Sequence, residues 1–253
     1  MMEKHISHQE LLREVVQFKE WSGPKIAKVF RKTGVPGYEL APIGSGGFIC
    51  YRDKYFFVTN NHVVQTIEEG NILENIVVPF SDHGKIIVQF VRCESDPDND
   101  ISVLEIDQQF AQSKSDKLFI DSKCFEDPKN YLNRCNFVFI HGFPSANTHI
   151  DNVEKVVETV SLPYVTFIKH YYEESNLISL FCENDGNIDE FQKKVQLPEL
   201  YGMSGSIVFS YRLGDVMYPY GVLGVVTNGT LSSETIWLTP IDDVISFIDS
   251  NFF

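Results

Sequence analysis

The sequence has no closely spaced cysteine pair, no long apolar run and no excess of basic residues. Its five cysteines are scattered and form no CxxC pair, which favours reduced thiols over a disulfide framework or a zinc site. No stretch approaches the roughly 18 apolar residues that a membrane-spanning helix requires. Residues 1–21 carry acids and bases throughout and lack the apolar core of a signal peptide. We therefore expect a cytoplasmic protein that does not contact a membrane.

Basic residues are few, since 21 Lys and Arg stand against 35 Asp and Glu and the formal net charge is −14. Binding to nucleic acid needs clustered Lys and Arg along the phosphates, so we expect no nucleic-acid partner. Apart from His62, the histidines show no spacing typical of metal ligands. We therefore expect no metal and no cofactor. A hydrophobic fraction of 43% is typical of a globular protein, and 253 residues are enough for one large domain or two small ones.

The first 34 residues have the apolar spacing of helices. A first apolar stripe consists of Leu11, Leu12, Val15, Val16 and Phe18. The segment Ser22-Gly23-Pro24 interrupts it, and a second stripe then consists of Ile26, Val29 and Phe30. We predict two helices here and interpret residues 1–34 as an N-terminal helical extension.

From residue 43 onward the chain consists of short β-rich runs separated by turn residues. The predicted strands are 47–51, 54–59, 75–79, 84–92, 101–106, 136–141, 154–161, 164–170, 176–182, 205–211, 220–227 and 234–238. This pattern indicates an all-β fold of antiparallel barrels or sandwiches. The polar stretch 183–194 is predicted to be an exposed loop. The chain ends in an apolar helical stripe, with Thr239 as its predicted N-cap.

The run YFFVTNNHVV, residues 55–64, is a strand pattern that ends at His62. Two chemical partners for this histidine follow along the chain. Asp100 stands where an acidic turn enters the strand ISVLEI, with Asp96 and Asp98 as rivals. Ser204 stands in the segment GMSGS, whose glycines allow a tight turn that exposes backbone N–H groups. His, Asp and Ser in this order form a candidate triad, in which the carboxylate orients the imidazole and the imidazole activates the serine.

These motifs resemble the trypsin-like serine peptidases, and most of all the protease domain of the HtrA/DegP group. The resemblance rests on GSGGFICYRDKYFFVTNNHVV, DPDNDISVLEI, FVFIHGFPSA, GMSGSIVF, GVLGVVTNG and IWLTPIDDVISFI. It spans residues 43–250 and is thin between residues 107 and 195. No PDZ domain is expected after the closing helix.

The resemblance implies a chymotrypsin-like fold of two antiparallel six-stranded β-barrels, at residues 35–125 and 126–253, with a closing C-terminal helix. The implied catalytic residues are His62, Asp100 and Ser204. The implied oxyanion hole consists of the backbone N–H groups of Gly202 and Ser204. Substrate would add as an extended strand along Val226, Thr227 and Asn228. Asn60 and Asn61 are interpreted as structural residues that close the strand end with local hydrogen bonds.

Three positions depart from the pattern of this family. Ser206 replaces a glycine of the serine loop. Met203 replaces the aspartate that pairs with a newly cut N-terminus in trypsin, so we do not expect that route of activation. Pro198 falls where trypsin has its specificity aspartate, which gives no support for cleavage after Arg or Lys. The neighbouring Glu199 could still contribute a charge to the segment 196–199, the expected base of the specificity pocket.

The sequence therefore predicts a serine endopeptidase that acts on protein or peptide substrates. A cytoplasmic protease has to spare the proteins of its own cell, so we expect narrow specificity or activation by a protein partner. The alternative is a protease-fold binding module that holds a protein partner without cleaving it. An esterase of the α/β-hydrolase type is excluded, because its Gly-x-Ser-x-Gly motif and its Ser, Asp, His order are absent.

Overall fold

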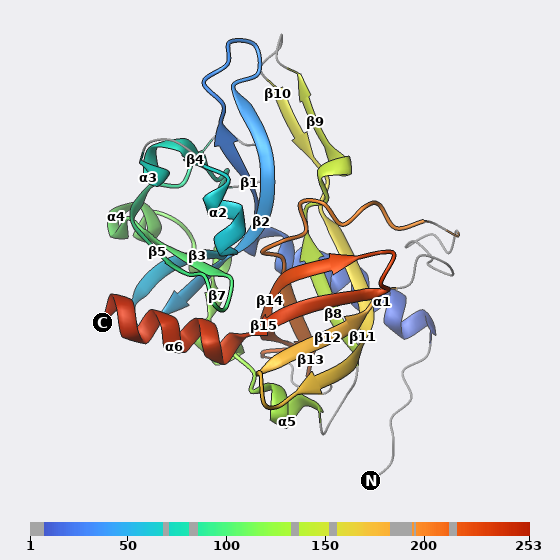
Figure 1. Ribbon diagram of the computed structural model, residues 1–253. Coiled ribbons are helices and arrows are strands. Elements are labelled where there is room, and N and C mark those ends of the chain that lie inside the picture. Colours follow the sequence, from blue (N-terminus) through green and yellow to red (C-terminus); the bar gives the residue numbers. More distant parts are fainter. Residues whose placement is uncertain are drawn as a thin grey trace.

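The computed structural model describes residues 8–67, 71–80, 86–132, 137–151, 156–182, 194, 196–212 and 217–253. Two β-units lie side by side, the first at the left of Figure 1 and the second at the right. Cys135 and nearly all of the predicted loop 183–194 lie outside the described residues. No helix in the described part has both the length and the apolar character needed to cross a membrane.

The first β-unit is a curved sheet whose main path contains six strands. Its strands are β1 (Ile26–Lys32), β2 (Leu40–Tyr51), β3 (Lys54–Thr59), β4 (Ile76–Val77), β5 (Phe90–Asp96) and β6 (Ile101–Ile106). The strand order is β4-β1-β2-β3-β6-β5, all antiparallel, and β7 (Ile120–Asp121) adds a short parallel pair to β2. Within the described residues this sheet is a half-barrel and does not close into a ring.

The second β-unit is a closed antiparallel barrel of six strands. Its strands are β8 (Phe137–Gly142), β11 (Leu162–Tyr172), β12 (Leu177–Phe181), β13 (Ile207–Tyr211), β14 (Tyr220–Thr230) and β15 (Thr235–Pro240). A separate hairpin of β9 (Thr148–Asp151) and β10 (Val156–Thr159) extends toward the same side as the β1–β2 hairpin (Figure 1). The predicted all-β class with two β-units is confirmed.

Helices are few and lie around the two β-units. The α-helices are α1 (His8–Ser22), α2 (Asn61–Gln65), α3 (Ile72–Asn75), α4 (Gln108–Gln112), α5 (Pro128–Leu132) and α6 (Ile241–Phe252). The 3₁₀ turns are η1 (Gly23–Lys25), η2 (Asp116–Leu118), η3 (Ser122–Cys124) and η4 (Ser145–Asn147).

The predicted C-terminal helix is confirmed as α6, but its predicted cap is wrong. Pro240 holds the N-cap position, and the Thr239 hydroxyl donates instead to the carbonyl oxygen of Asn99 at 2.9 Å.

The second helix predicted near the N-terminus is wrong, because Ile26, Val29 and Phe30 lie on the strand β1. This strand runs between β2 and β4, and its first five residues are all buried. A strand that is buried on both faces has no alternation that would distinguish it from a helix. The first predicted helix is confirmed as α1, and its Phe18 is fully buried in the core.

The main hydrophobic core contains residues of both β-units. From the first it takes Ile49, Phe56, Val58, Ile101 and Val103. From the second it takes Phe139, Ile207, Phe209, Val222 and Val225. Helices α1 and α6 complete it, and α6 leads from the second unit back along the first (Figure 1).

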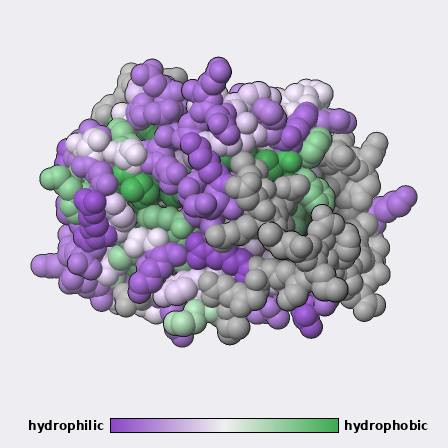
Figure 2. Space-filling view, turned by 90° about the horizontal axis from the view of Figure 1, so that it is seen from below, coloured by the Kyte–Doolittle hydropathy of each residue, from purple (hydrophilic) through white to green (hydrophobic). Residues whose placement is uncertain are grey.

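The face seen in Figure 2 is largely hydrophilic between small apolar patches, as expected for an acidic chain.

Candidate active site

His62 lies in the short helix α2, directly after strand β3, and is held by Asp100 at two points. The backbone N–H of His62 donates to Asp100 Oδ1 at 2.9 Å, and its ring Nδ1 lies 2.7 Å from Asp100 Oδ2. An ionised carboxylate can only accept hydrogen bonds, so Nδ1 carries the proton in this arrangement. In the neutral ring, Nε2 then keeps a free lone pair.

Asp100 is separated from its two rivals by the geometry of the turn before β6. The carboxylate of Asp96 accepts hydrogen bonds from the backbone N–H groups of Asp98 and Asn99, so Asp96 caps the turn. The Asn60 amide donates to the carbonyl oxygen of Asp100 at 2.9 Å, across 40 residues of sequence. The local role that we predicted for Asn60 is therefore wrong, because this asparagine fixes the Asp100 turn against the end of β3.

Ser204 lies in a tight loop before β13, and two glycines shape this loop. Gly202 and Gly205 have φ angles of 86° and 84°, in the left-handed region that favours glycine. A Cβ at Gly205 would lie 2.0 Å from the carbonyl oxygen of Ser45, so no side chain fits there. Ser45 in turn donates its backbone N–H to the carbonyl oxygen of Ser204 at 2.8 Å. Strand β2 of the first unit therefore holds the serine loop of the second.

The structure explains two of the departures from the family pattern, those at Ser206 and Met203. Ser206 is fully buried, and its Oγ lies 1.7 Å from where a Cβ of Gly142 would be. The serine therefore fills the space that Gly142 leaves on strand β8. Met203 is 4% exposed and packs in the core of the second barrel, with its sulfur 3.8 Å from Ser206 Oγ.

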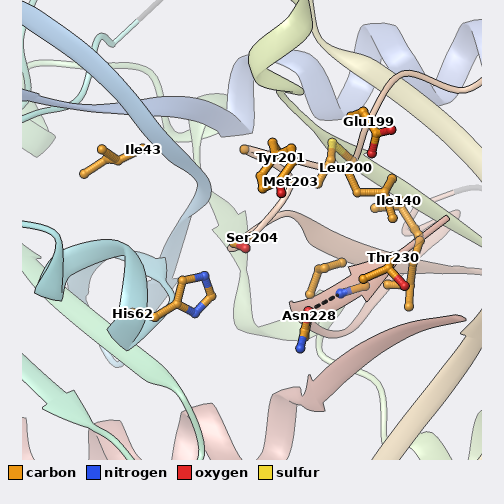
Figure 3. Close-up of a pocket in the computed structure, with 14 residues that line it drawn as sticks. Ile43, His62, Ile140, Glu199, Leu200, Tyr201, Met203, Ser204, Asn228 and Thr230 are labelled. Atoms are coloured by element: carbon orange, nitrogen blue, oxygen red, sulfur yellow. Dashed lines mark hydrogen bonds between the residues drawn. The ribbon is translucent and has the colours of Figure 1, made fainter. Parts of the chain in front are cut away.

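His62 and Ser204 open onto one pocket of about 480 Å³. Its lining consists of Ile43, His62, Ile140, Glu199, Leu200, Tyr201, Gly202, Met203, Ser204, Val226, Asn228, Gly229, Thr230 and Ile236. Figure 3 shows His62 and Ser204 at one end of the pocket and Glu199 and Thr230 at the other. No hydrogen bond in the described part joins Ser204 Oγ to His62 Nε2.

The remaining site residues that we predicted are only partly in this pocket. Val226 and Asn228 line it, whereas Thr227 sits at a bulge of β14 and donates its hydroxyl to the carbonyl oxygen of Trp237. Of the predicted base 196–199, only Glu199 lines the pocket. Sequence reasoning missed the wall residues Ile140 and Ile236, which come from strands β8 and β15, because nothing in the sequence distinguishes them from the other apolar residues of those strands.

The four cysteines in the described part of the chain lie away from this pocket. Cys50, Cys93, Cys124 and Cys182 are free cysteines, and none of these four lines it. Burial raises the pKa of Cys93, Cys124 and Cys182 to about 11. These three therefore stay protonated near neutral pH, and Ser204 is the candidate nucleophile of the pocket.

The half-barrel, the closed barrel and the closing helix define a chymotrypsin-like fold, which is a protease-like fold. Among solved structures, the chain is similar to the active form of the Rv3671c protease from M. tuberculosis, with a TM-score of 0.55. The match has 16% sequence identity and covers 94% of this chain and 85% of that one. At this identity the likeness shows the fold alone. No family model matches the sequence, and no curated protein matches it either.

Proposed function

We propose that this chain is a serine endopeptidase of the HtrA/DegP-like type. One observation carries the proposal: His62, which is hydrogen-bonded to Asp100, lines the same pocket as Ser204. The similarity to a protein described as a protease in its active form supports the same reaction. Protein or peptide chains would be the substrates.

In the proposed reaction, Ser204 Oγ attacks the peptide carbonyl while His62 Nε2 takes the serine proton. His62 then passes this proton to the leaving amine, and Asp100 stabilises the imidazolium that forms in between. The missing hydrogen bond between Ser204 and His62 would have to form with substrate bound. Catalytic hydrogen bonds are often long or poorly aligned in free enzymes and tighten when substrate binds.

The backbone N–H groups of Gly202 and Ser204 would stabilise the oxyanion that develops on the substrate. Neither group donates a hydrogen bond within the described part of the chain, so both are available to a ligand. A donor at this place contributes about 10²–10³ in rate.

The substrate would pair with strand β14 as an added strand. Pairing of β13 with β14 ends at Ile207 and Val225, whereas pairing with β15 continues past Asn228. The serine loop continues this edge to Val226, whose backbone bonds Gly205 and Ser206, and beyond it no described strand pairs with this edge of β14 at Asn228. An extended peptide can bind such an edge by main-chain hydrogen bonds. The apolar walls of Ile140 and Ile236 favour an apolar side chain at the cleavage site and a narrow substrate range.

Reaction with a fluorophosphonate, a probe that modifies activated serines, tests this function. We expect the wild type to be labelled and Ser204→Ala to remain unlabelled. Ser210→Ala is the matched control, because it removes a buried hydroxyl that forms no hydrogen bond within the described ranges. This control should be labelled like the wild type. No labelling of a folded wild type, even with candidate partner proteins present, would favour the binding module that holds a partner without cleaving it.

A further inference from the structure

Lys28 is a buried lysine beneath the serine loop. It lies on strand β1 and is only 2% exposed. Its Nζ donates to the carbonyl oxygen of Phe143 at 2.6 Å and to Ser145 Oγ at 3.2 Å. No carboxylate in the described ranges forms an ion pair with it, and burial lowers the pKa of Lys28 to about 8. A buried ammonium without a counter-charge is costly, so its position calls for an explanation.

The ammonium of Lys28 also packs against the backbone of Gly202. A Cβ at Gly202 would lie 2.4 Å from Lys28 Nζ and 2.5 Å from Ser145 Oγ. The backbone N–H of Ser145 donates to the carbonyl oxygen of Tyr201 at 2.6 Å. The segment 143–145 therefore connects the ammonium on β1 to the peptide group that joins Tyr201 and Gly202.

This peptide group decides where the N–H of Gly202 points. In a trans peptide the carbonyl and the following N–H point in opposite directions. Because the Tyr201 carbonyl is fixed toward Ser145, the Gly202 N–H is directed away from the segment 143–145. The peptide group that joins Met203 and Ser204 is fixed in the same way. The Met203 carbonyl accepts from the N–H of Ser206, and this orients the N–H of Ser204.

Ser45 reinforces this arrangement from the neighbouring strand. It is the cross-strand partner of Lys28 in the pairing of β1 with β2. Its hydroxyl donates to the Gly202 carbonyl oxygen at 2.6 Å and accepts from the Phe143 N–H at 2.9 Å. Lys28 and Ser45 together attach the serine loop and the segment 143–145 to the first β-unit.

We propose that Lys28 is a positioning residue of the oxyanion hole, holding the segment 143–145 so that the Gly202 N–H stays turned toward the substrate. This inference rests on the proposed peptidase function. A methionine at position 28 leaves the Phe143 carbonyl and Ser145 Oγ without the lysine donor, which loosens the segment 143–145 and weakens its hold on the Tyr201–Gly202 peptide. Ser204, His62 and the substrate edge of β14 remain in place.

The test compares Lys28→Met with Lys25→Met by the kinetics of fluorophosphonate labelling. Lys25 is a matched control, because it too is buried, burial lowers its pKa to about 8, and its Nζ donates to a backbone carbonyl, that of Trp21. It does not touch the serine loop. For Lys28→Met we expect the maximal labelling rate to fall about 10- to 100-fold, the cost of misplacing one donor rather than removing it. The probe concentration at half-maximal rate should stay unchanged, and Lys25→Met should keep the wild-type rate.

Thermal unfolding of both variants separates positioning from stability. A selective loss of rate in Lys28→Met, at a melting temperature close to that of Lys25→Met, supports the proposal. Equal rates in the two folded variants overturn it. If Lys28→Met does not fold, Ser145→Ala replaces it, because this variant removes one acceptor of the ammonium from a partly exposed position. A maximal rate at the wild-type level in Ser145→Ala would then overturn the proposal. A folded wild type without any labelling would instead contradict the peptidase function itself.

Discussion

Asp100 reaches His62 from a backbone conformation that few residues adopt. Its φ angle is 52°, in the left-handed region, where Asn and Asp occur more often than other residues with a side chain. This conformation brings one carboxylate oxygen to the His62 backbone and the other to the imidazole. The side chain therefore both positions the histidine and selects the proton-bearing nitrogen of its ring.

We expect Asp100→Asn to lower the maximal rate of peptide cleavage or fluorophosphonate labelling by about 10⁴-fold. Asparagine tolerates the same backbone conformation, but its amide can present a donor to Nδ1 and so favour the wrong tautomer. Asp98→Asn is the control, because Asp98 lies in the same turn and only its backbone is hydrogen-bonded there. A loss of less than tenfold in folded Asp100→Asn would contradict the role proposed for this carboxylate.

Strand β1 shows where sequence reasoning succeeded and where it failed. Most strands and the contact of Asp100 with His62 could be predicted, because alternation, turn residues and local motifs mark them. The identity of β1 could not, since its first five residues are all buried and Ile26, Val29 and Phe30 also fit a helix. Misplacing β1 concealed Lys28, whose partners lie more than a hundred residues away. The catalytic roles of the site residues stay predictions.

Helix α1 docks on strand β8 through a buried histidine. His141 is fully buried, and its Nδ1 lies 2.7 Å from Ser22 Oγ. The Ser22 hydroxyl donates to the Phe18 carbonyl oxygen, so His141 is the donor in the pair, and its Nε2 has no hydrogen-bond partner among the described residues. Burial lowers the pKa of His141 from 6.5 to about 3, with a smaller contribution from the positive charge of Lys19. In the folded chain His141 is therefore a neutral imidazole near neutral pH.

This contact predicts a loss of stability in acid. The unfolded chain binds a proton at His141 below pH 6.5, whereas the folded chain does so only near pH 3. Stability therefore falls as the pH decreases through this window, by about 2 kcal/mol at about pH 5. We expect His141→Gln, which does not titrate, to lose about that much less than the wild type when urea unfolding is compared at about pH 7.5 and about pH 5. Equal losses in both proteins would show that His141 does not control the acid response.

The two β-units share one core and one set of cross-connections, so we expect the molecule to unfold as a single unit. The main core joins strands of both units with Phe18 of α1 and Phe252 of α6. Ser45 also attaches the serine loop to the first unit, and Lys28 attaches the segment 143–145. A site between two units requires this coupling, because His62 belongs to one unit and Ser204 to the other.

Phe18→Ala tests this cooperativity, because Phe18 is fully buried and stacks on Phe139 of β8. We expect a loss of about 3–5 kcal/mol, typical of truncating a buried phenylalanine. Val16→Ala in the same helix is the control, since Val16 is 41% exposed, and it should cost less than about 1 kcal/mol. The chain has two tryptophans, Trp21 on α1 and Trp237 on β15, so variants that keep only one of them report on α1 or on the barrel. Coincident urea transitions of the two reporters, shifted together by Phe18→Ala, are expected. An earlier transition of Trp21 alone would mean that α1 is a detachable extension and that the site does not depend on it.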